Sequence, residues 1–257
     1  MNEFRPMSVP SLFDATFQLY RDRFATFLVI ALVAHVPYSV MVALVLPTGR
    51  IEVDARGEPQ ITGAMALGLI GIFAYAIVFL QLCIAAMTHN ISASYLGENL
   101  SATESYRRAV PRLVPLIITE ILVGIVCLVG YCMCFVPGIV FTCWFYVTAP
   151  VVILEGWSFT QAMSRSRNLA QGNLAKVFLV VTVLFLLRLI FILMLEIIMH
   201  LVPGPRFVIM FTASILNAFI LPIEAAPCVL LYYDLRIRKE AFDLQMLASA
   251  LQPATSP

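Results

Sequence analysis

Four ionisable side chains interrupt long apolar stretches of the sequence: His35, Glu120, Arg188 and Glu224. A charge in the core of a bilayer costs at least about 2.5–3.5 kcal/mol, so such groups normally pair or line a cavity. Counted at about 1.5 Å per residue from the nearest flanking cation, all but Glu120 lie about 18 Å deep, close to mid-membrane. Glu120 lies about 6 Å shallower. The sequence predicts a midplane polar layer that binds a substrate or relays protons, or that only holds helices together.

Arg188 is the residue of this layer that most requires an anionic partner inside the bundle. A guanidinium does not deprotonate in proteins, and it cannot reach the interface from this depth. The Pro203-Gly204-Pro205 turn predicts that the apolar runs on either side of it are antiparallel neighbours. Glu224 then lies at matching depth and is the expected partner, with Glu120 second and Glu196 third.

A second group of charges flanks the apolar runs on one side: Glu155, Arg165, Arg167, Asp234 and Arg236. We expect these residues to form a cytoplasmic polar cluster. In particular, at least one of Arg165 and Arg167 should pair with Asp234 or Glu155, at under about 1 kcal/mol for a partly solvated pair.

The sequence contains none of the common catalytic motifs. It has no Ser-His-Asp order, HExxH spacing, glycine-rich phosphate loop or CxxC pair. Its three histidines, His35, His89 and His200, belong to different depths and do not converge on one metal. We therefore expect no catalytic residue, no metal, no cofactor and no enzymatic activity. The six cysteines lie in or beside apolar runs, where cysteine acts as a small apolar side chain.

Composition places the chain in a membrane. Of the 257 residues, 61% are hydrophobic and 12% are charged, whereas a soluble domain carries about 25% charged residues. Lipid must therefore be one of the solvents, and membrane lipids are the first expected partner. The net charge of +1 argues against nucleic acid, which requires a concentrated basic surface.

Six apolar runs are long enough, or nearly long enough, to span a bilayer, which takes about 20 residues. They cover residues 24–46, 61–87, 113–130, 135–154, 177–199 and 207–233, followed by a tail at 234–257. A tight turn at Val136-Pro137-Gly138 is expected between the third and the fourth.

The distribution of Lys and Arg predicts how these spans are oriented in the membrane. Of the 16 Lys and Arg residues, three (Arg50, Arg56 and Arg206) fall on one side, Arg188 lies within a span, and twelve fall on the other side. Those twelve are Arg5, Arg21, Arg23, Arg107, Arg108, Arg112, Arg165, Arg167, Lys176, Arg236, Arg238 and Lys239. Cytoplasmic loops carry the excess of Lys and Arg, so we predict a multi-pass protein of the cell membrane with both termini in the cytoplasm.

A similar short segment precedes each pair of apolar runs. Residues 11–14, 101–104 and 158–161 each begin with Ser and have Asp, Glu or Gln at the fourth position, which is the spacing of a helix-capping box. Each leads into a short amphipathic segment, with Phe13, Phe17 and Tyr20 on one face of the first and Phe159 and Met163 on one face of the third. The expected fold is an all-α integral membrane protein with six transmembrane helices. We predict three repeats of an amphipathic interfacial helix plus a transmembrane hairpin.

Two segments resemble a bacterial membrane-protein family. The first is Glu155-Gly156-Trp157-Ser158 with Ala162, Arg165, Ser166, Leu169 and Gly172, and the second is the run LYYDLRIRKEAFDL at residues 231–244. Both resemble the family named for the membrane domain of glycerophosphoryl diester phosphodiesterases, over nearly the whole chain. In some members of that family a soluble barrel carries the catalysis. Such a barrel needs roughly 250 residues and is not expected here, so the resemblance supplies no catalytic residue.

Three functions fit these features. The preferred one is a non-enzymatic membrane protein that organises lipids or partner proteins at the cytoplasmic face. The alternatives are a transporter or channel that uses the midplane layer, and the membrane subunit of a separate phosphodiesterase-type enzyme. The possible partners beyond lipids are therefore another membrane protein or a soluble protein.

Overall fold

The computed structural model describes residues 6–45, 63–201 and 205–240, and these residues form helices and short connections without a β-strand. Six of the helical stretches in this part of the chain are long and apolar enough to cross a membrane. They cover Phe24–Val45, Gly63–Tyr95, Ala102–Met133, Phe135–Glu155, Leu174–Ile198 and Phe211–Glu240. The predicted all-α membrane fold with six spans is confirmed.

Each pair of spans follows a short helix. Helix α1 (Val9–Asp22) precedes α2 (Phe24–Val45) and the stretch α3 (Gly63–Tyr75), η1 (Ala76–Leu80) and α4 (Gln81–Tyr95). Helix α5 (Ala102–Ala109) and the turn η2 (Val110–Arg112) precede α6 (Leu113–Met133), α7 (Phe135–Phe145), α8 (Thr148–Pro150) and η3 (Val151–Glu155). Helix α9 (Phe159–Ala170) precedes α10 (Leu174–Leu201) and α11 (Arg206–Glu240). The order matches the three predicted units.

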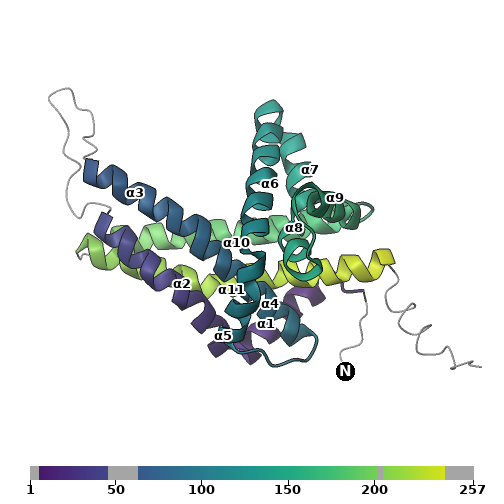
Figure 1. Ribbon diagram of the computed structural model, residues 1–257, viewed down its shortest axis with the longest axis horizontal. Helices are drawn as coiled ribbons and strands as arrows, with labels where there is room; N and C mark the ends of the chain where they lie inside the picture. Colours follow the sequence, from purple (N-terminus) through teal and green to yellow (C-terminus); the bar gives the residue numbers. More distant parts are fainter. Residues whose placement is uncertain (1–5, 46–62, 202–204, 241–257) are drawn as a thin grey trace, which may run out of the picture.

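Helix α11 lies at the centre of the molecule and packs against α1, α2, α4, α9 and α10. Its most extensive partner is α2. Small side chains are buried on both helices, Ala31 and Ala34 on α2 and Ala218 and Ala226 on α11. Lipid tails are as apolar as these side chains, so association between spans depends on close packing, which small residues allow. Figure 1 shows α2, α3, α10 and α11 running together, while the α6–α7 hairpin extends away from them at an angle.

The α6–α7 hairpin turns at Cys134, which has an extended backbone (φ −171°) between the two helices. The turn predicted at Val136-Pro137-Gly138 is wrong, because these residues form the first turn of α7. Proline is tolerated there, since the first amides of a helix have no intrahelical acceptor. Glycine brings the two helices together: a β-carbon added at Gly130 would lie 3.1 Å from the α-carbon of Gly138.

The three predicted capping boxes have different outcomes. Ser101 accepts a hydrogen bond from the Glu104 amide at 3.2 Å, as expected, although the Glu104 carboxylate binds Arg107 and Arg108 instead of reaching back. Helix α1 begins earlier than predicted, because Ser8 is its cap and accepts from the Ser11 amide at 3.3 Å. The Ser158 side chain caps nothing.

The buried faces of the short helices also differ in part from the prediction. On α1, Leu12 and Thr16 are buried, whereas Phe17 is 53% exposed. On α9, Ala162, Ser166 and Leu169 form the buried face, whereas Phe159, which was expected on the apolar face, is exposed. The tightly packed faces therefore consist of small and aliphatic residues, and Phe17 and Phe159 lie outside them.

Several spans extend beyond their predicted apolar runs. The second continues to Tyr95, and α11 continues to Glu240, so residues 234–240 are helical although they were predicted as part of the tail. The rest of the predicted tail, 241–257, lies outside the described residues. Two π-helical segments, η1 and η3, interrupt spans.

Candidate functional site

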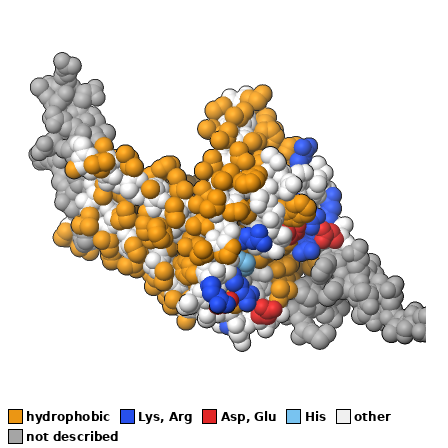
Figure 2. All heavy atoms as spheres, viewed as in Figure 1, with side chains coloured by type: hydrophobic (Ala, Val, Ile, Leu, Met, Phe, Trp, Pro, Cys, Tyr) orange, Lys and Arg blue, Asp and Glu red, His pale blue; other side chains and the backbone are white. Residues whose placement is uncertain are grey.

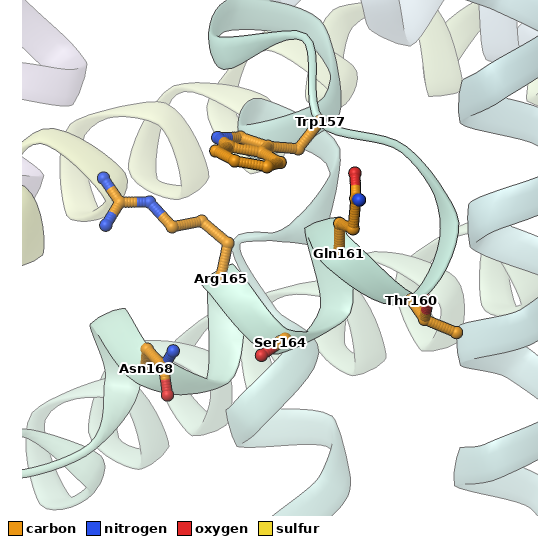
Figure 3. Close-up of a pocket in the computed structure, with 6 residues that line it drawn as sticks. All are labelled: Trp157, Thr160, Gln161, Ser164, Arg165 and Asn168. Atoms are coloured by element: carbon orange, nitrogen blue, oxygen red, sulfur yellow. The ribbon is translucent and has the colours of Figure 1, made fainter.

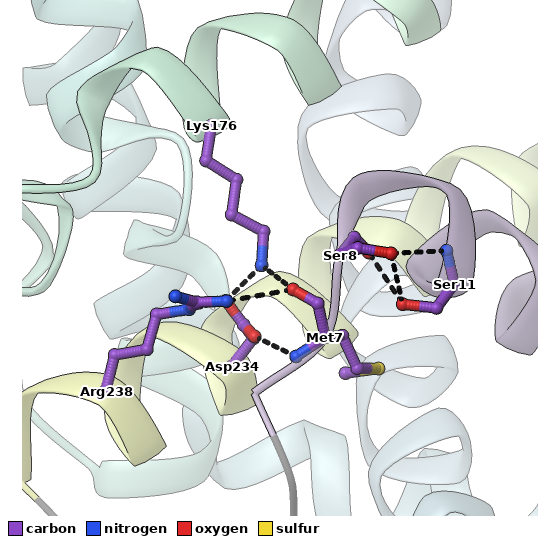
Figure 4. Close-up of polar contacts among 6 residues, drawn as sticks. All are labelled: Met7, Ser8, Ser11, Lys176, Asp234 and Arg238. Carbon is purple, nitrogen blue, oxygen red and sulfur yellow. Dashed lines mark hydrogen bonds and ion pairs between the residues drawn. The ribbon is translucent and has the colours of Figure 1, made fainter.

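Polar side chains gather in two ionic clusters at one end of the bundle, and in an ion pair and a separate cavity within it. The first, named here the Asp234 cluster, consists of Asp234, Lys176, Arg238 and the backbone of Met7 (Figure 4). The fully buried Asp234 carboxylate accepts from Lys176 Nζ at 2.5 Å, from Arg238 Nε at 2.9 Å and from the Met7 amide at 2.6 Å. Lys176 and Arg238 also donate to the Met7 carbonyl, at 2.5 and 3.0 Å. One carboxylate thus ties the start of the chain to α10 and α11.

The second group, the Arg165 cluster, joins α9 to α11 and to the end of η3. Arg165 donates to both oxygens of Glu155, at 2.8 and 3.1 Å, and also binds Glu240. The Tyr232 hydroxyl donates to Glu155 at 2.8 Å, and Arg236 binds Glu240 at 2.9 Å. The hydrogen bonds to Glu155, and those to Glu240 after them, raise the pKa of Arg165 above its ordinary value.

Helix α9 leaves an open polar groove beside this cluster. The groove is lined by Trp157, Thr160, Gln161, Ser164, Arg165 and Asn168. Figure 3 shows the Trp157 indole above the helix and Arg165 extending away toward α11. Because the Arg165 guanidinium is engaged by two carboxylates, its charge is largely satisfied within the protein.

Of the ion pairs predicted for this group of charges, one is present. Arg165 pairs with Glu155, as expected, and Arg236 lies in the same cluster. Arg167 does not pair with either predicted carboxylate: its guanidinium stacks over the Trp144 ring, 4.3 Å from the centroid. Asp234 belongs to a separate cluster, because Lys176 and Arg238 occupy its oxygens.

Sequence reasoning missed Lys176, Arg238, Glu240 and the Met7 backbone. Two of these could have been found from spacing alone, because Arg238 lies four residues after Asp234, and Glu240 four after Arg236. Oppositely charged side chains at this spacing meet on one face of a helix. The approach of Met7 and Lys176 depends on tertiary packing and has no such signal.

The layer inside the bundle contains the expected ion pair. Arg188 Nη1 lies 3.4 Å from Glu224 Oε1, and the guanidinium lies 5.9 Å from the Phe191 ring centroid. His35 bonds the Ala31 carbonyl of its own helix at 3.0 Å. Glu224 is therefore the partner of Arg188, as first predicted, and Glu120 is not.

Glu120 instead lines a separate cavity of about 280 Å³ between α4 and the α6–α7 hairpin. Its walls also include Gln81, Cys127, Thr142 and Tyr146. The midplane layer predicted from the sequence thus divides into a paired site on α10 and α11 and an isolated acid on α6.

The end of the bundle that carries both ionic clusters is named here the basic end. It consists of residues 6–23, 95–112, 155–176 and 234–240, which contain eleven Lys and Arg against seven Asp and Glu, an excess of four positive charges. Figure 2 shows basic side chains gathered at this end and hydrophobic side chains over the rest of the visible face. Within the described residues, no group of three or more His, Cys, Asp or Glu is placed to hold a metal ion.

The fold and the distribution of charge define a polytopic α-helical membrane protein with one basic end. Comparison with protein-family models, with curated proteins and with solved structures finds no match to this chain.

Proposed function

We propose that this protein is a non-enzymatic membrane module that binds anionic phospholipid headgroups at the cytoplasmic leaflet of the cell membrane. The excess of positive charge at the basic end, spread over short surface helices, carries the proposal. Arg107 and Arg108 on α5 are 79% and 49% exposed and share a single acid, Glu104. Each such cation near an anionic membrane surface contributes about 1 kcal/mol of attraction.

The orientation supports the same proposal. The basic end carries the positive residues that the positive-inside rule assigns to the cytoplasm. The cytoplasmic leaflet is also the one that holds anionic lipids and a negative surface potential. The basic end and the anionic headgroups would therefore face each other.

Aromatic side chains at this end support contact with headgroups. Phe17 on α1, Trp157 before α9 and Phe159 at its start are 53%, 45% and 42% exposed. Trp is enriched at the membrane–water boundary, and Phe is typical of the apolar face of helices that lie there. Helices with such rings beside arginines lie in the headgroup plane.

The two ionic clusters give this surface a fixed shape. The Arg165 cluster holds α9 on α11, and the Asp234 cluster holds the segment before α1 on α10 and α11. A surface whose groups are already positioned loses less conformational entropy when a ligand binds. This is the role that we propose for the buried ion pairs.

The alternatives have weaker support. Arg188 is already paired with Glu224, so the ion pair is explained by helix packing and does not require a transported substrate. The family resemblance would place a separate phosphodiesterase against the same basic end, and co-purification of a soluble hydrolase would favour that function instead.

Charge variants on α5 test the proposal with effects of opposite sign. The protein is reconstituted in nanodiscs of phosphatidylcholine and phosphatidylglycerol, and the lipids it retains are counted by native mass spectrometry. Arg107→Gln with Arg108→Gln should weaken phosphatidylglycerol retention by about fivefold per lost charge, equivalent to about 1 kcal/mol each. Glu104→Gln should strengthen retention, because it removes the acid that these arginines share.

All three side chains lie on the surface, so the variants should unfold within about 0.5 kcal/mol of the parent protein. Higher salt should reduce the difference between them, since exposed charges are screened. Equal retention of phosphatidylglycerol and phosphatidylcholine by the parent protein would contradict the proposal. A change of the same sign in the arginine variant and in Glu104→Gln would do so as well.

A further inference from the structure

The cavity that contains Glu120 lies inside the bilayer region, away from the basic end. It occupies about 280 Å³ and is lined by α4, α6, α7 and α8, with Gln81, Glu120, Cys127, Thr142 and Tyr146 as its polar or sulfur-bearing residues. Counted at about 1.5 Å per residue from Arg112 at the start of α6, Glu120 lies about 12 Å from the basic end. Ile84, Val123 and Phe145 make the rest of the wall apolar.

Two polar side chains of this cavity, Glu120 and Gln81, have no partner among the residues that the structure describes. Neither the Glu120 carboxylate nor the Gln81 amide group forms a hydrogen bond or an ion pair with any other residue that the structure describes. Glu224, by contrast, pairs with Arg188 at 3.4 Å. An acid at membrane depth is costly, and residues of this kind normally pair or line a functional cavity. Glu120 lines a cavity but is not paired with any other residue that the structure describes.

The backbone around the cavity is irregular on two sides. The π-helical segment η1 ends at Leu80, directly before Gln81, and η3 begins at Val151, just after Ala149, which lines the cavity. Single π-helical turns are rare and frequently mark functional sites. Helix α7 also ends at the cavity, with Phe145.

The lining therefore offers a carboxylate, an amide oxygen, a hydroxyl group and two aromatic rings, Phe145 and Tyr146, within apolar walls. No Lys or Arg is among the described lining residues. Carboxylates and aromatic faces both attract ammonium groups. We propose that this cavity binds the primary ammonium group of an amphiphile, with Glu120 as its counter-ion and the apolar walls against its alkyl chain.

This ligand differs from the anionic headgroups proposed for the basic end, and the two sites share no residue. The same ammonium chemistry occurs in the headgroup of phosphatidylethanolamine and in free alkylamines. The ligand must also bring its own apolar tail, because the cavity opens among spans that face lipid.

Photolabelling locates the ligand and identifies its source. The full-length protein in phosphatidylcholine nanodiscs is incubated with a dodecylamine that carries a diazirine in its chain, or with a phosphatidylethanolamine that carries the same diazirine. Labelled peptides are mapped by mass spectrometry. We expect labelling on α4, α6 and α7 by at least one probe, and the probe that labels identifies the source. A diazirine dodecanol of the same length measures non-specific partitioning.

Glu120→Gln should reduce labelling by about tenfold, the equivalent of one lost charge-assisted contact, and Glu120→Asp should retain most of it. Glu98→Gln, which removes an exposed carboxylate, is the matched control and should have no effect. The fold should tolerate Glu120→Gln, because no described residue depends on that carboxylate. Equal labelling of the cavity by the alcohol and the amines would overturn the proposal, as would labelling that Glu120→Gln leaves unchanged.

Discussion

Asp234→Asn is expected to destabilise the protein by about 3–5 kcal/mol, the usual cost of removing one partner from a buried ion pair. The carboxylate is fully buried and receives hydrogen bonds from Lys176, Arg238 and the Met7 amide. An amide in its place offers one oxygen and turns an NH₂ group toward these donors. Lys176, whose side chain is only 13% exposed, would be left as an uncompensated charge. Reversible unfolding in mixed micelles measures the loss.

The Asp234 variant should also release the start of the chain. Met7 is held there through its backbone, so limited proteolysis should cut near it sooner in Asp234→Asn than in the parent protein. Asp14→Asn, which changes an exposed carboxylate on α1, is the control and should shift stability by under about 0.5 kcal/mol. Similar stability and proteolysis in both variants would show that the Asp234 cluster does not anchor this segment.

The second large effect concerns Arg188 and Glu224. Glu224→Gln leaves a permanent cation at mid-membrane depth and should cost about 2.5–3.5 kcal/mol. Arg188→Met should cost less, because the remaining carboxyl group can take up a proton and become neutral, which a guanidinium cannot do. The side chains are 40% and 28% exposed in the isolated protein, so contact with lipid or water can reduce both costs.

The double variant Arg188→Met with Glu224→Leu separates pairing from packing. Replacement of both members of an ion pair by apolar residues of similar volume is often neutral, so its stability should exceed that of Glu224→Gln alone. A double-mutant cycle of unfolding free energies, built from Arg188→Met alone, Glu224→Leu alone and the double variant, gives the coupling between the two residues. A coupling near zero would mean that the pair contributes nothing to the fold.

The depth of Arg188 and Glu224 along the spans could be predicted from the sequence. Counting residues from the flanking cations, together with the turn predicted at 203–205, selected Glu224 as the partner of Arg188, and the two lie 3.4 Å apart. Residues 203 and 204 of that turn lie outside the described residues. Hydropathy likewise predicted six spans, because the requirement for about 20 apolar residues leaves few alternatives. The same counting did not predict that Glu120 lies in a separate cavity. That depends on the angle at which the α6–α7 hairpin leaves the other spans (Figure 1).

Local backbone detail was less predictable. Ser11 and Ser158 have the spacing of capping residues, yet Ser8 starts α1 and Ser158 leaves α9 uncapped. Pro10 explains the first case, because proline is favoured in the first turn of a helix and so moves the start toward Ser8. In the second case, Phe159 has a left-handed backbone (φ 54°), and its amide donates to Thr119 Oγ1 at 2.9 Å. A tertiary contact thus replaces the local cap.

The ionic clusters show a similar division. Glu155 and Arg165 are separated by a short connection, so their pairing was within reach of sequence reasoning. The Asp234 cluster joins Met7, Lys176 and Asp234, which are distant in the sequence and meet only because α11 is central. The stacking of Arg167 on Trp144 also follows from the packing of α9 against α7.

The orientation on which the lipid proposal depends is measured most directly by thiol labelling in intact cells. In a variant without the six natural cysteines, single cysteines are introduced as Gly57→Cys or Pro257→Cys and treated with a membrane-impermeant maleimide. With six spans and the basic end in the cytoplasm, Gly57→Cys should react in intact cells, and Pro257→Cys should react only after permeabilisation. Reaction of both from the same side, or the reverse pattern, would contradict this orientation and with it the binding of cytoplasmic anionic lipids by the basic end.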